Sequence, residues 1–217
     1  MKVLHLSDTH GFPFWERDIP SDVELVVHTG DLILDMGWGT ADVFLETSHA
    51  IDSLREIAPL ISNWLQGRHL IYVPGNHDFA ELMHFLPQAY RVDETTLINI
   101  NGKTFSGYAG IPYIYGKWNH ELSSDVLRLK LAEALSNNPD VLITHCGPSG
   151  ILSNGPNKEV YGCKTQASIL NGSGFGNVKH HLFGHIHCGP AIANIAGICF
   201  SNAAGDPKAS NGNILDI

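Results

Sequence analysis

The chain has 217 residues, of which 43% are hydrophobic and 16% are charged, and 22 acidic against 13 basic side chains give a formal net charge of −9. This composition excludes a disordered or fibrous chain, because ample apolar surface is available for burial. It also disfavours a non-specific nucleic-acid binder, because an acidic surface repels phosphates, so nucleic acid is expected only as a nucleotide-like substrate. The length suits one domain spanning residues 1–217, and the low charged fraction permits a homo-oligomer.

The cysteine pattern indicates the compartment. The four cysteines, at positions 146, 163, 188 and 199, form no C-x-x-C pair and are few for the length, which favours a reduced protein over a disulfide scaffold. No apolar run approaches the roughly 20 residues that span a bilayer, and the first residues lack a signal-peptide pattern. We therefore expect a cytoplasmic protein with no membrane partner.

Short, continuous apolar runs predict strands that are covered on both faces. In chain order, these strands are expected at residues 2–6, 23–28, 69–73, 97–100, 103–106, 141–144, 181–183, 195–200 and 213–216. A helix is expected at residues 41–57, with an apolar stripe of Val43, Phe44, Ile51 and Leu54, and Pro59 should end or kink it. A second helix is expected at 126–135 and a long loop at 149–162. The fold class is therefore α/β, with a mostly parallel first half.

Metal-competent side chains follow five of the predicted strands directly. They are Asp8 and His10, Asp31, Asn76 with His77 and Asp78, His145, and His185 with His187. The carboxyl ends of strands in an open α/β sheet form the crevice where ligands bind. Residues two apart on an extended backbone point the same way, so each Asp-x-His or His-x-His pair can face one ion. Glycines before Asp31, Asn76 and His185 allow tight turns and a close backbone approach.

The inventory of two aspartates, one asparagine and four histidines suits two divalent transition-metal ions if Asp31 bridges them. Imidazole with carboxylate favours Mn, Fe, Zn or Ni over Ca or Mg, and manganese is the preferred candidate. Two such ions about 3.5–4 Å apart activate a bridging water and clamp the oxygens of an in-line phosphoryl displacement. His77 is left over as a general acid for the leaving oxygen, and Asp78 could orient it.

These motifs, in this order, resemble the calcineurin-like metallophosphoesterases over residues 8–187. The resemblance implies a four-layer α-β-β-α fold, in which a two-sheet mixed β-sandwich is flanked by helices, and hydrolysis of phosphomonoesters or diesters by a metal-bridging hydroxide. It implies that Asn76 and His77 contact the substrate. It also implies two ligand sets that share Asp31: one ion takes Asp8, His10, Asp31 and His187, and the other takes Asp31, Asn76, His145 and His185.

Within that family, residues 144–150 and 181–187 are similar to a branch of small phosphodiesterases. Protein serine/threonine phosphatases carry arginines near the bridging aspartate and after the Asn-His pair, whereas this chain has Leu34, Asp35 and Phe79 in those regions. We therefore expect a small phosphate ester as substrate, with a phosphodiesterase or small-molecule phosphatase activity. A protein phosphatase, a nuclease and a non-catalytic scaffold with the same fold are the alternatives.

Aromatic residues lie close to these motifs in the sequence. They are Phe12, Phe14, Trp15, Trp38 and Trp118. They could stack on a planar group of the substrate or pack beneath their own loops. In the predicted long loop, Asn157, Lys158 and Tyr161 are candidates for lining a substrate pocket.

Overall fold

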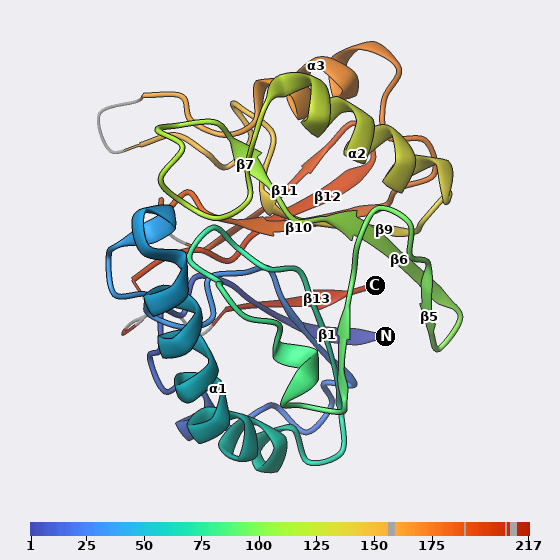
Figure 1. Ribbon diagram of the computed structural model, residues 1–217. Coiled ribbons are helices and arrows are strands. Elements are labelled where there is room, and N and C mark those ends of the chain that lie inside the picture. The colour runs from blue at the N-terminus through green and yellow to red at the C-terminus, as the bar shows by residue number, and fades with distance from the viewer. Residues whose placement is uncertain (156–158, 189, 207, 209–211) are drawn as a thin grey trace.

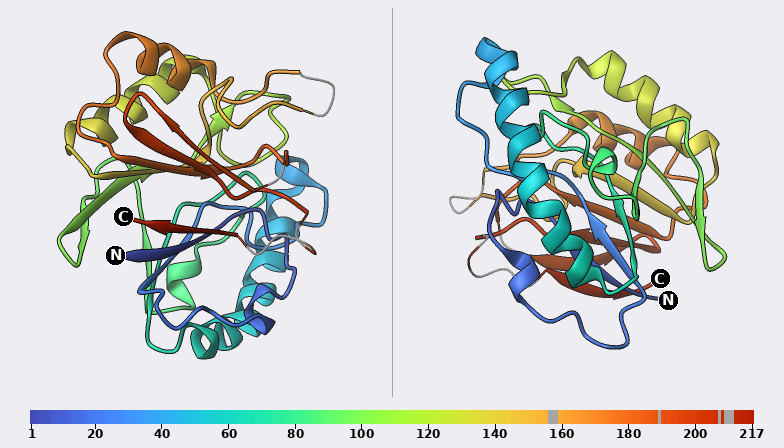
Figure 2. Two further views of the ribbon diagram at one scale, coloured as in Figure 1. Left: turned by 180° about the vertical axis from the view of Figure 1, so that it is seen from behind. Right: turned by 60° about the horizontal axis from the view of Figure 1, so that its bottom comes forward.

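The computed structural model describes residues 1–155, 159–188, 190–206, 208 and 212–217. Within them, two sheets lie face to face between helices (Figure 1). Helix α1 (Val43–Leu65) covers the outer face of one sheet, and α2 (Ser124–Ser136) and α3 (Lys164–Gly172) lie on the outer side of the other, as the views in Figure 2 also show. This is the predicted four-layer α-β-β-α sandwich.

The first sheet has five strands, four of them parallel, with β13 antiparallel at one edge. In spatial order they are β13 (Asn213–Asp216), β1 (Lys2–Leu6), β2 (Leu25–His28), β3 (His69–Tyr72) and β4 (Ala89–Arg91). Short 3₁₀ helices precede β2, α1 and β4, at Phe14–Glu16, Gly39–Asp42 and Leu82–His84.

The second sheet has six strands, of which the inner four are parallel and both edge strands are antiparallel. In spatial order they are β11 (Ala191–Ile195), β12 (Ile198–Asn202), β10 (His180–Gly184), β9 (Val141–Cys146), β6 (Lys103–Tyr108) and β5 (Ile98–Ile100). A separate parallel pair joins β7 (Ile111–Pro112) to β8 (Glu121–Leu122).

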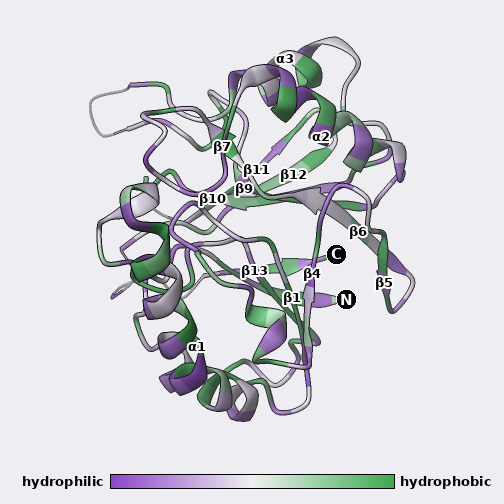
Figure 3. Cartoon of the chain, viewed as in Figure 1, coloured by the Kyte–Doolittle hydropathy of each residue, from purple (hydrophilic) through white to green (hydrophobic). Residues whose placement is uncertain are grey.

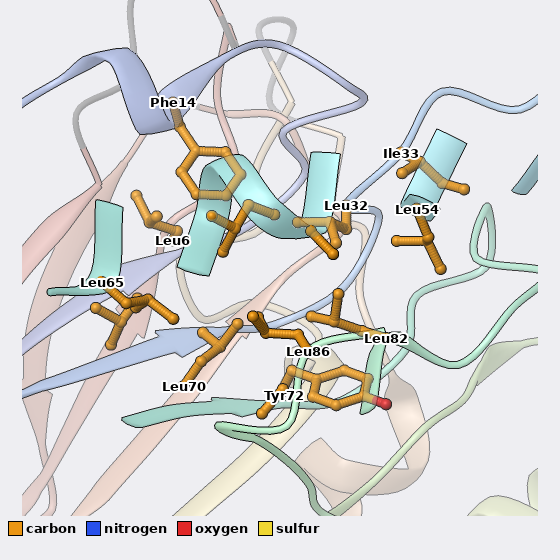
Figure 4. Packing of buried hydrophobic residues seen from close by; sticks show 14 of the residues in the cluster. Leu6, Phe14, Leu32, Ile33, Leu54, Leu65, Leu70, Tyr72, Leu82 and Leu86 are labelled. Carbon is orange, nitrogen blue, oxygen red and sulfur yellow. The ribbon is translucent and has the colours of Figure 1, made fainter. Parts of the chain in front are cut away.

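Strand residues alternate between two hydrophobic layers, which explains why the runs are continuously apolar. In β3, Ile71 faces the second sheet in one buried cluster, whereas Leu70 and Tyr72 belong to the cluster beneath α1. Figure 4 shows this second cluster, with Leu54 and Leu65 of the helix packed toward the strand side chains. Both faces of the sheet are therefore covered, as the absence of polar alternation predicts.

Helix α1 differs from its prediction in length and in buried face. It continues through Pro59 to Leu65, with Asp42 as N-cap accepting a bond from the Leu45 amide at 3.1 Å. Its buried stripe contains Ala50, Leu54, Ala58, Ile61 and Leu65. The predicted stripe is confirmed at Leu54 but wrong at Val43 and Phe44, whose side chains are 48% and 80% exposed. Figure 3 shows hydrophobic and hydrophilic segments alternating along this helix.

Other predicted elements hold with small shifts, and one is wrong. The hairpin around Asn101-Gly102 and the loop in the described part of 149–162 are confirmed. Residues 195–200 are not one strand, because Ala196 and Gly197 adopt positive φ and form the turn between β11 and β12. Helix α3 and the edge strands β4 and β11 were not predicted.

None of the helices in the described part of the chain combines the length and apolarity needed to cross a membrane.

Candidate metal centre

The predicted ligands lie at the carboxyl ends of the central parallel strands of both sheets. Asp8 follows β1, Asp31 follows β2 and Asn76 follows β3, all in the first sheet. His145 is the second-to-last residue of β9, and His185 follows β10, both in the second sheet. The fold therefore places them at one edge of the sandwich, although they are spread over most of the sequence.

Two groups of side chains have the spacing of a metal site. Within each group, one ligand atom per residue lies within 4.8 Å of the others. The first group contains Asp8, His10 and His187, and the second contains Asp31, His145 and His185.

Asp31 connects the two groups. Its Oδ2 lies 3.3 Å from His145 Nε2 in its own group and 4.0 Å from His10 Nε2 in the other. Asn76 Oδ1 lies 3.1 Å from His145 Nε2, on the Asp31 side. All seven predicted ligands are therefore gathered together, and the structure divides them in the way that the sequence motifs imply.

The local backbone that aims these side chains is not extended. Four of them have positive φ: Asp8 at 52°, His10 at 45°, Asp31 at 55° and His185 at 67°. Such values are uncommon for residues with a side chain. The ligand residues therefore lie in turns and not in extended strands, so residues two apart need not point the same way. His185 and His187 accordingly belong to different groups.

Three positions beside the candidate ligands have no room for a side chain, and each is a glycine. A Cβ on Gly30 would lie 2.6 Å from His145 Nδ1, and one on Gly75 would lie 2.1 Å from Asp31 Oδ1. A Cβ on Gly184 would lie 2.3 Å from Asp8 Oδ2. The expected close approach of backbone to ligand is therefore present at all three positions.

Hydrogen bonds outside the centre fix the ligand orientations. His145 Nδ1 donates to the Thr29 carbonyl at 2.6 Å, so its Nε2 faces Asp31. Asp8 Oδ2 accepts bonds from the Ser7 hydroxyl and from the His185 amide. Such outer contacts set the histidine tautomer and the direction of each donor.

The electrostatics of the centre favour bound cations. Asp8 and Asp31 are 0% and 1% exposed, and in the part of the chain that the structure describes no lysine or arginine pairs with either. Burial opposes ionisation of Asp31, but the surrounding imidazoles, His145 above all, hold its pKa below the usual range. Burying anions without a cation is costly, so this donor set fits divalent metals.

The pKa of His145 reflects the same excess of buried negative charge. Burial lowers its pKa, but the Asp31 and Asp8 carboxylates outweigh burial and raise the pKa to about 10. A histidine ligand must be neutral, so metal binding here would release a proton.

His77 lies beside the centre and is held by a residue that the sequence analysis did not assign. Its Nδ1 is hydrogen-bonded to Asp35, and its Nε2 lies 4.0 Å from Asp31 Oδ2. The prediction that Asp78 orients His77 is wrong. The Asp78 carboxylate instead accepts bonds from the backbone amides of Asp31, Leu32 and Gly75, at 2.8 to 3.0 Å.

Asp35 could have been found from its position four residues after Asp31, in the loop that leaves the same strand. Asp78 has a different task, which is to hold the Asp31 turn against the Gly75 turn. Burial and the nearby Asp31 charge raise the Asp78 pKa to about 6.

The aromatic candidates separate into two kinds. Phe14 is buried beneath its loop, with Trp15 and Trp64 at ring distances of 5.1 Å. Trp118 instead contacts the His77 ring, with centroids 4.5 Å apart, and Trp38 is 52% exposed. Asn157 and Lys158 lie outside the described residues.

Two glutamates hold the loops around His77. Glu121 accepts bonds from five consecutive backbone amides, those of residues 114–118, at 2.7 to 3.1 Å. Glu46, buried in α1, accepts bonds from the amides of Met36, Trp38 and Gly39. Thr40 joins the two loops through bonds to the Gly116 and Lys117 carbonyls. Neither glutamate was predicted, because each bonds the amides of an irregular loop 3 to 10 residues away and belongs to none of the metal-site motifs.

Solved structures support the fold alone. One crystal structure superposes with a TM-score of 0.74 at 14% identity, covering 94% of this chain and 90% of the other. An archaeal phosphodiesterase has 17% identity, coverage of 100% and 93%, and a TM-score of 0.44. A predicted phosphoesterase from Streptococcus pneumoniae TIGR4 has 16% identity, coverage of 94% and 72%, and a TM-score of 0.39. The last two TM-scores are too low to support an argument.

The sequence itself identifies the family. No curated protein matches the chain significantly. A family model for calcineurin-like phosphoesterases matches residues 1–189, which include all seven candidate ligands and His77. The chain belongs to the calcineurin-like phosphoesterase family.

Proposed function

We propose that this protein is a dinuclear-metal-dependent phosphoester hydrolase that acts on a small phosphodiester or monoester. The observation that carries the proposal is the pair of adjoining ligand groups connected by Asp31, with His77 beside them. Asp8, His10, Asp31 and His187 would hold one cation, and Asp31, Asn76, His145 and His185 the other. Manganese is the preferred metal, with iron, zinc or nickel as alternatives.

The bound cations would supply a nucleophile at neutral pH and neutralise the charge of the phosphate. The protein's own groups do the rest. Asn76 carries an amide whose NH₂ can donate to a phosphate oxygen. His77, with its Nδ1 held by Asp35, has Nε2 free to give a proton to the departing oxygen.

The surroundings of the centre favour a small substrate. Protein phosphatases of this family use arginines to grip phosphate, and the described ion pairs place no arginine at the ligand groups. The retention of all seven ligands argues against a non-catalytic scaffold. The cytoplasmic location and a homo-oligomeric state stay predictions.

The direct test compares metal binding with turnover. Chelator-treated protein should take up two equivalents of Mn²⁺ in calorimetry, and the loaded protein should hydrolyse bis-p-nitrophenyl phosphate or p-nitrophenyl phosphate. A preference for the first substrate supports a diesterase.

Two variants compare a change inside the metal centre with a change on the protein surface. Asp31→Asn should lose metal-dependent turnover and the uptake of at least one ion. Asp52→Asn, a change at an exposed position of α1, should retain both. Wild-type turnover in Asp31→Asn, or full turnover by chelator-treated protein, would refute the proposal.

A further inference from the structure

An apolar pocket adjoins the metal centre. It has a volume of about 230 Å³ and is lined chiefly by Pro112, Ile114, Val160, Tyr161, Ile186 and His185. His185 also belongs to the second ligand group, so the pocket directly adjoins that group. Ile114, Val160 and Tyr161 are 42%, 58% and 48% exposed. Apolar surface is therefore left open beside a polar centre.

The walls of this pocket are held in place before any ligand arrives. Asn202 Nδ2 donates to the carbonyls of Leu152 and Ile186, at 2.9 and 3.0 Å, and so ties the lining residue Ile186 to the segment that precedes Ser153. Ser153, fully buried, bonds the backbone of Tyr161 through both its carbonyl and its hydroxyl. The Ile114 amide is fixed by Glu121. A pre-formed apolar pocket with few polar groups is typical of a small-molecule site.

The pocket is separate from the surroundings of His77. Among the described residues, Asp35, His10 and Trp118 lie against the His77 ring and Asp31 Oδ2 lies 4.0 Å from its Nε2, and none of these four lines the pocket. A leaving oxygen that takes its proton from His77 departs among these residues. The pocket is therefore available to a different part of the substrate.

We propose that this pocket binds an aromatic ring carried on the ester oxygen that does not leave, so the substrate is a phosphodiester with an aryl-type substituent. The inference rests on the proposed function and narrows its substrate class. A planar ring fits the apolar walls and gains both from burial and from contact with the Tyr161 ring. A monoester has no second substituent and would leave the pocket unused.

The test uses two diesters that share one leaving group. Phenyl p-nitrophenyl phosphate and methyl p-nitrophenyl phosphate differ only in the substituent that stays. For the manganese-loaded protein, kcat/KM divided by the uncatalysed rate should be about tenfold or more higher for the phenyl ester, as expected for an apolar group in a matching pocket.

Variants at exposed positions test the pocket without disturbing the metal ligands. Val160→Trp fills the pocket and should bring the phenyl-to-methyl ratio close to one, and Ile114→Ala should lower the ratio by widening the pocket. Tyr115→Trp is the matched control, because Tyr115 is 76% exposed on the same loop and does not line the pocket. It should keep the wild-type ratio.

Calorimetric titration with diphenyl phosphate and dimethyl phosphate gives a readout that does not depend on turnover. The diphenyl ester should bind more tightly to wild type, and Val160→Trp should remove the difference. If both p-nitrophenyl diesters are hydrolysed equally and Val160→Trp changes neither ratio nor binding, the pocket inference is overturned and the hydrolase proposal stands. If the loaded protein hydrolyses neither, the proposed function fails and this inference fails with it.

Discussion

At the candidate ligand residues, the backbone adopts conformations that cost free energy on their own. Asp8, His10, Asp31 and His185 all adopt left-handed φ values, each of which costs about 1–3 kcal/mol for an ordinary residue. They persist because their backbone amides are bonded. The Asp31 amide donates to the Asp78 carboxylate, the Asp8 and His10 amides donate to the Gly30 and Asp31 carbonyls, and the His185 amide donates to Asp8 Oδ2. Glycines beside these turns allow the close approach. The side chains that would bind metal are thus aimed before a metal arrives.

Exchange of Asp35 for asparagine should reveal its role as a positioning residue for His77. Asp35→Asn keeps the shape but loses the carboxylate that contacts His77 Nδ1. The expected result is a loss of about tenfold to a hundredfold in kcat for diesters with alkoxide leaving groups, and a smaller loss for p-nitrophenolate, which needs no proton. The measurement is the dependence of kcat on leaving-group pKa. An equal loss for both leaving groups would remove His77 and Asp35 from proton transfer.

A methyl group at Gly75 should damage the second ligand group. The Cβ of Gly75→Ala would meet Asp31 Oδ1 at 2.1 Å, so Asp31 or the Gly75 turn must move. We expect Mn²⁺ affinity to fall at least about tenfold, comparable to the loss of an orienting contact at a metal ligand. Gly172→Ala is the control, because nothing lies within 4 Å of a Cβ there. Unchanged calorimetric affinity in Gly75→Ala would contradict this account.

Among the elements, helix α1 shows how tertiary position overrides a local rule. Pro59 cannot donate to the carbonyl of Arg55, yet the helix continues to Leu65. Both Pro59 and Arg55 are exposed, so water can satisfy the carbonyl that Pro59 leaves free. The buried stripe of Ala50, Leu54, Ala58, Ile61 and Leu65 meanwhile holds both halves of the helix against the sheet.

Replacing Pro59 by alanine should therefore stabilise the protein. Pro59→Ala restores the missing backbone bond on the solvent side and should raise the free energy of unfolding by about 1–3 kcal/mol. Urea denaturation of the metal-loaded protein measures this. A lower midpoint in the variant would mean that the proline is needed for the helix geometry.

At the scale of the whole molecule, buried histidines connect the two sheets. His5 of β1 bonds Ser201 of β12 at 2.8 Å and Thr29 at 3.1 Å. Asn213 of β13 donates to the Ser201 hydroxyl and to the Asn202 carbonyl. Burial lowers the pKa of His5 and of His181 to about 3. Both are therefore neutral in the folded protein at pH values where the unfolded chain takes up protons.

This linkage predicts a loss of stability in mild acid. The unfolded pKa of a histidine is about 6.5, so His181 costs no stability above that pH and about 2 kcal/mol at about pH 5, because only the unfolded state is protonated. His181 is surrounded by the rings of Phe175, Phe183 and Phe200. His181→Phe removes one group that takes up a proton only in the unfolded state. The slope of unfolding free energy against pH, between about pH 6.5 and 5, should therefore fall by up to about 1.4 kcal/mol per pH unit. Identical slopes in urea titrations at the same metal content would contradict the assignment.

The sequence alone identified the candidate metal ligands, which the fold gathers in two adjoining groups, and most of the strands. Ligand types such as the His185-x-His187 pair are local chemistry, and strands covered on both faces leave a continuous apolar run that needs no tertiary information to recognise. That residues 1–217 form a single domain stays a prediction, as does metal binding itself.

Only the tertiary structure decided which groups act on one another. Asp35 rather than Asp78 contacts His77, because the loop after β2 returns to the centre while the Asp78 carboxylate is occupied by three backbone amides. Glu46 and Glu121 hold the surrounding loops, and the pocket beside His185 is built from four separate segments. The Asp35–His77 contact and the pocket depend on distances between residues far apart in the chain, and no local pattern of residues encodes those distances. The two glutamates bond amides nearby in the chain, but only the folded loops show which amides these are.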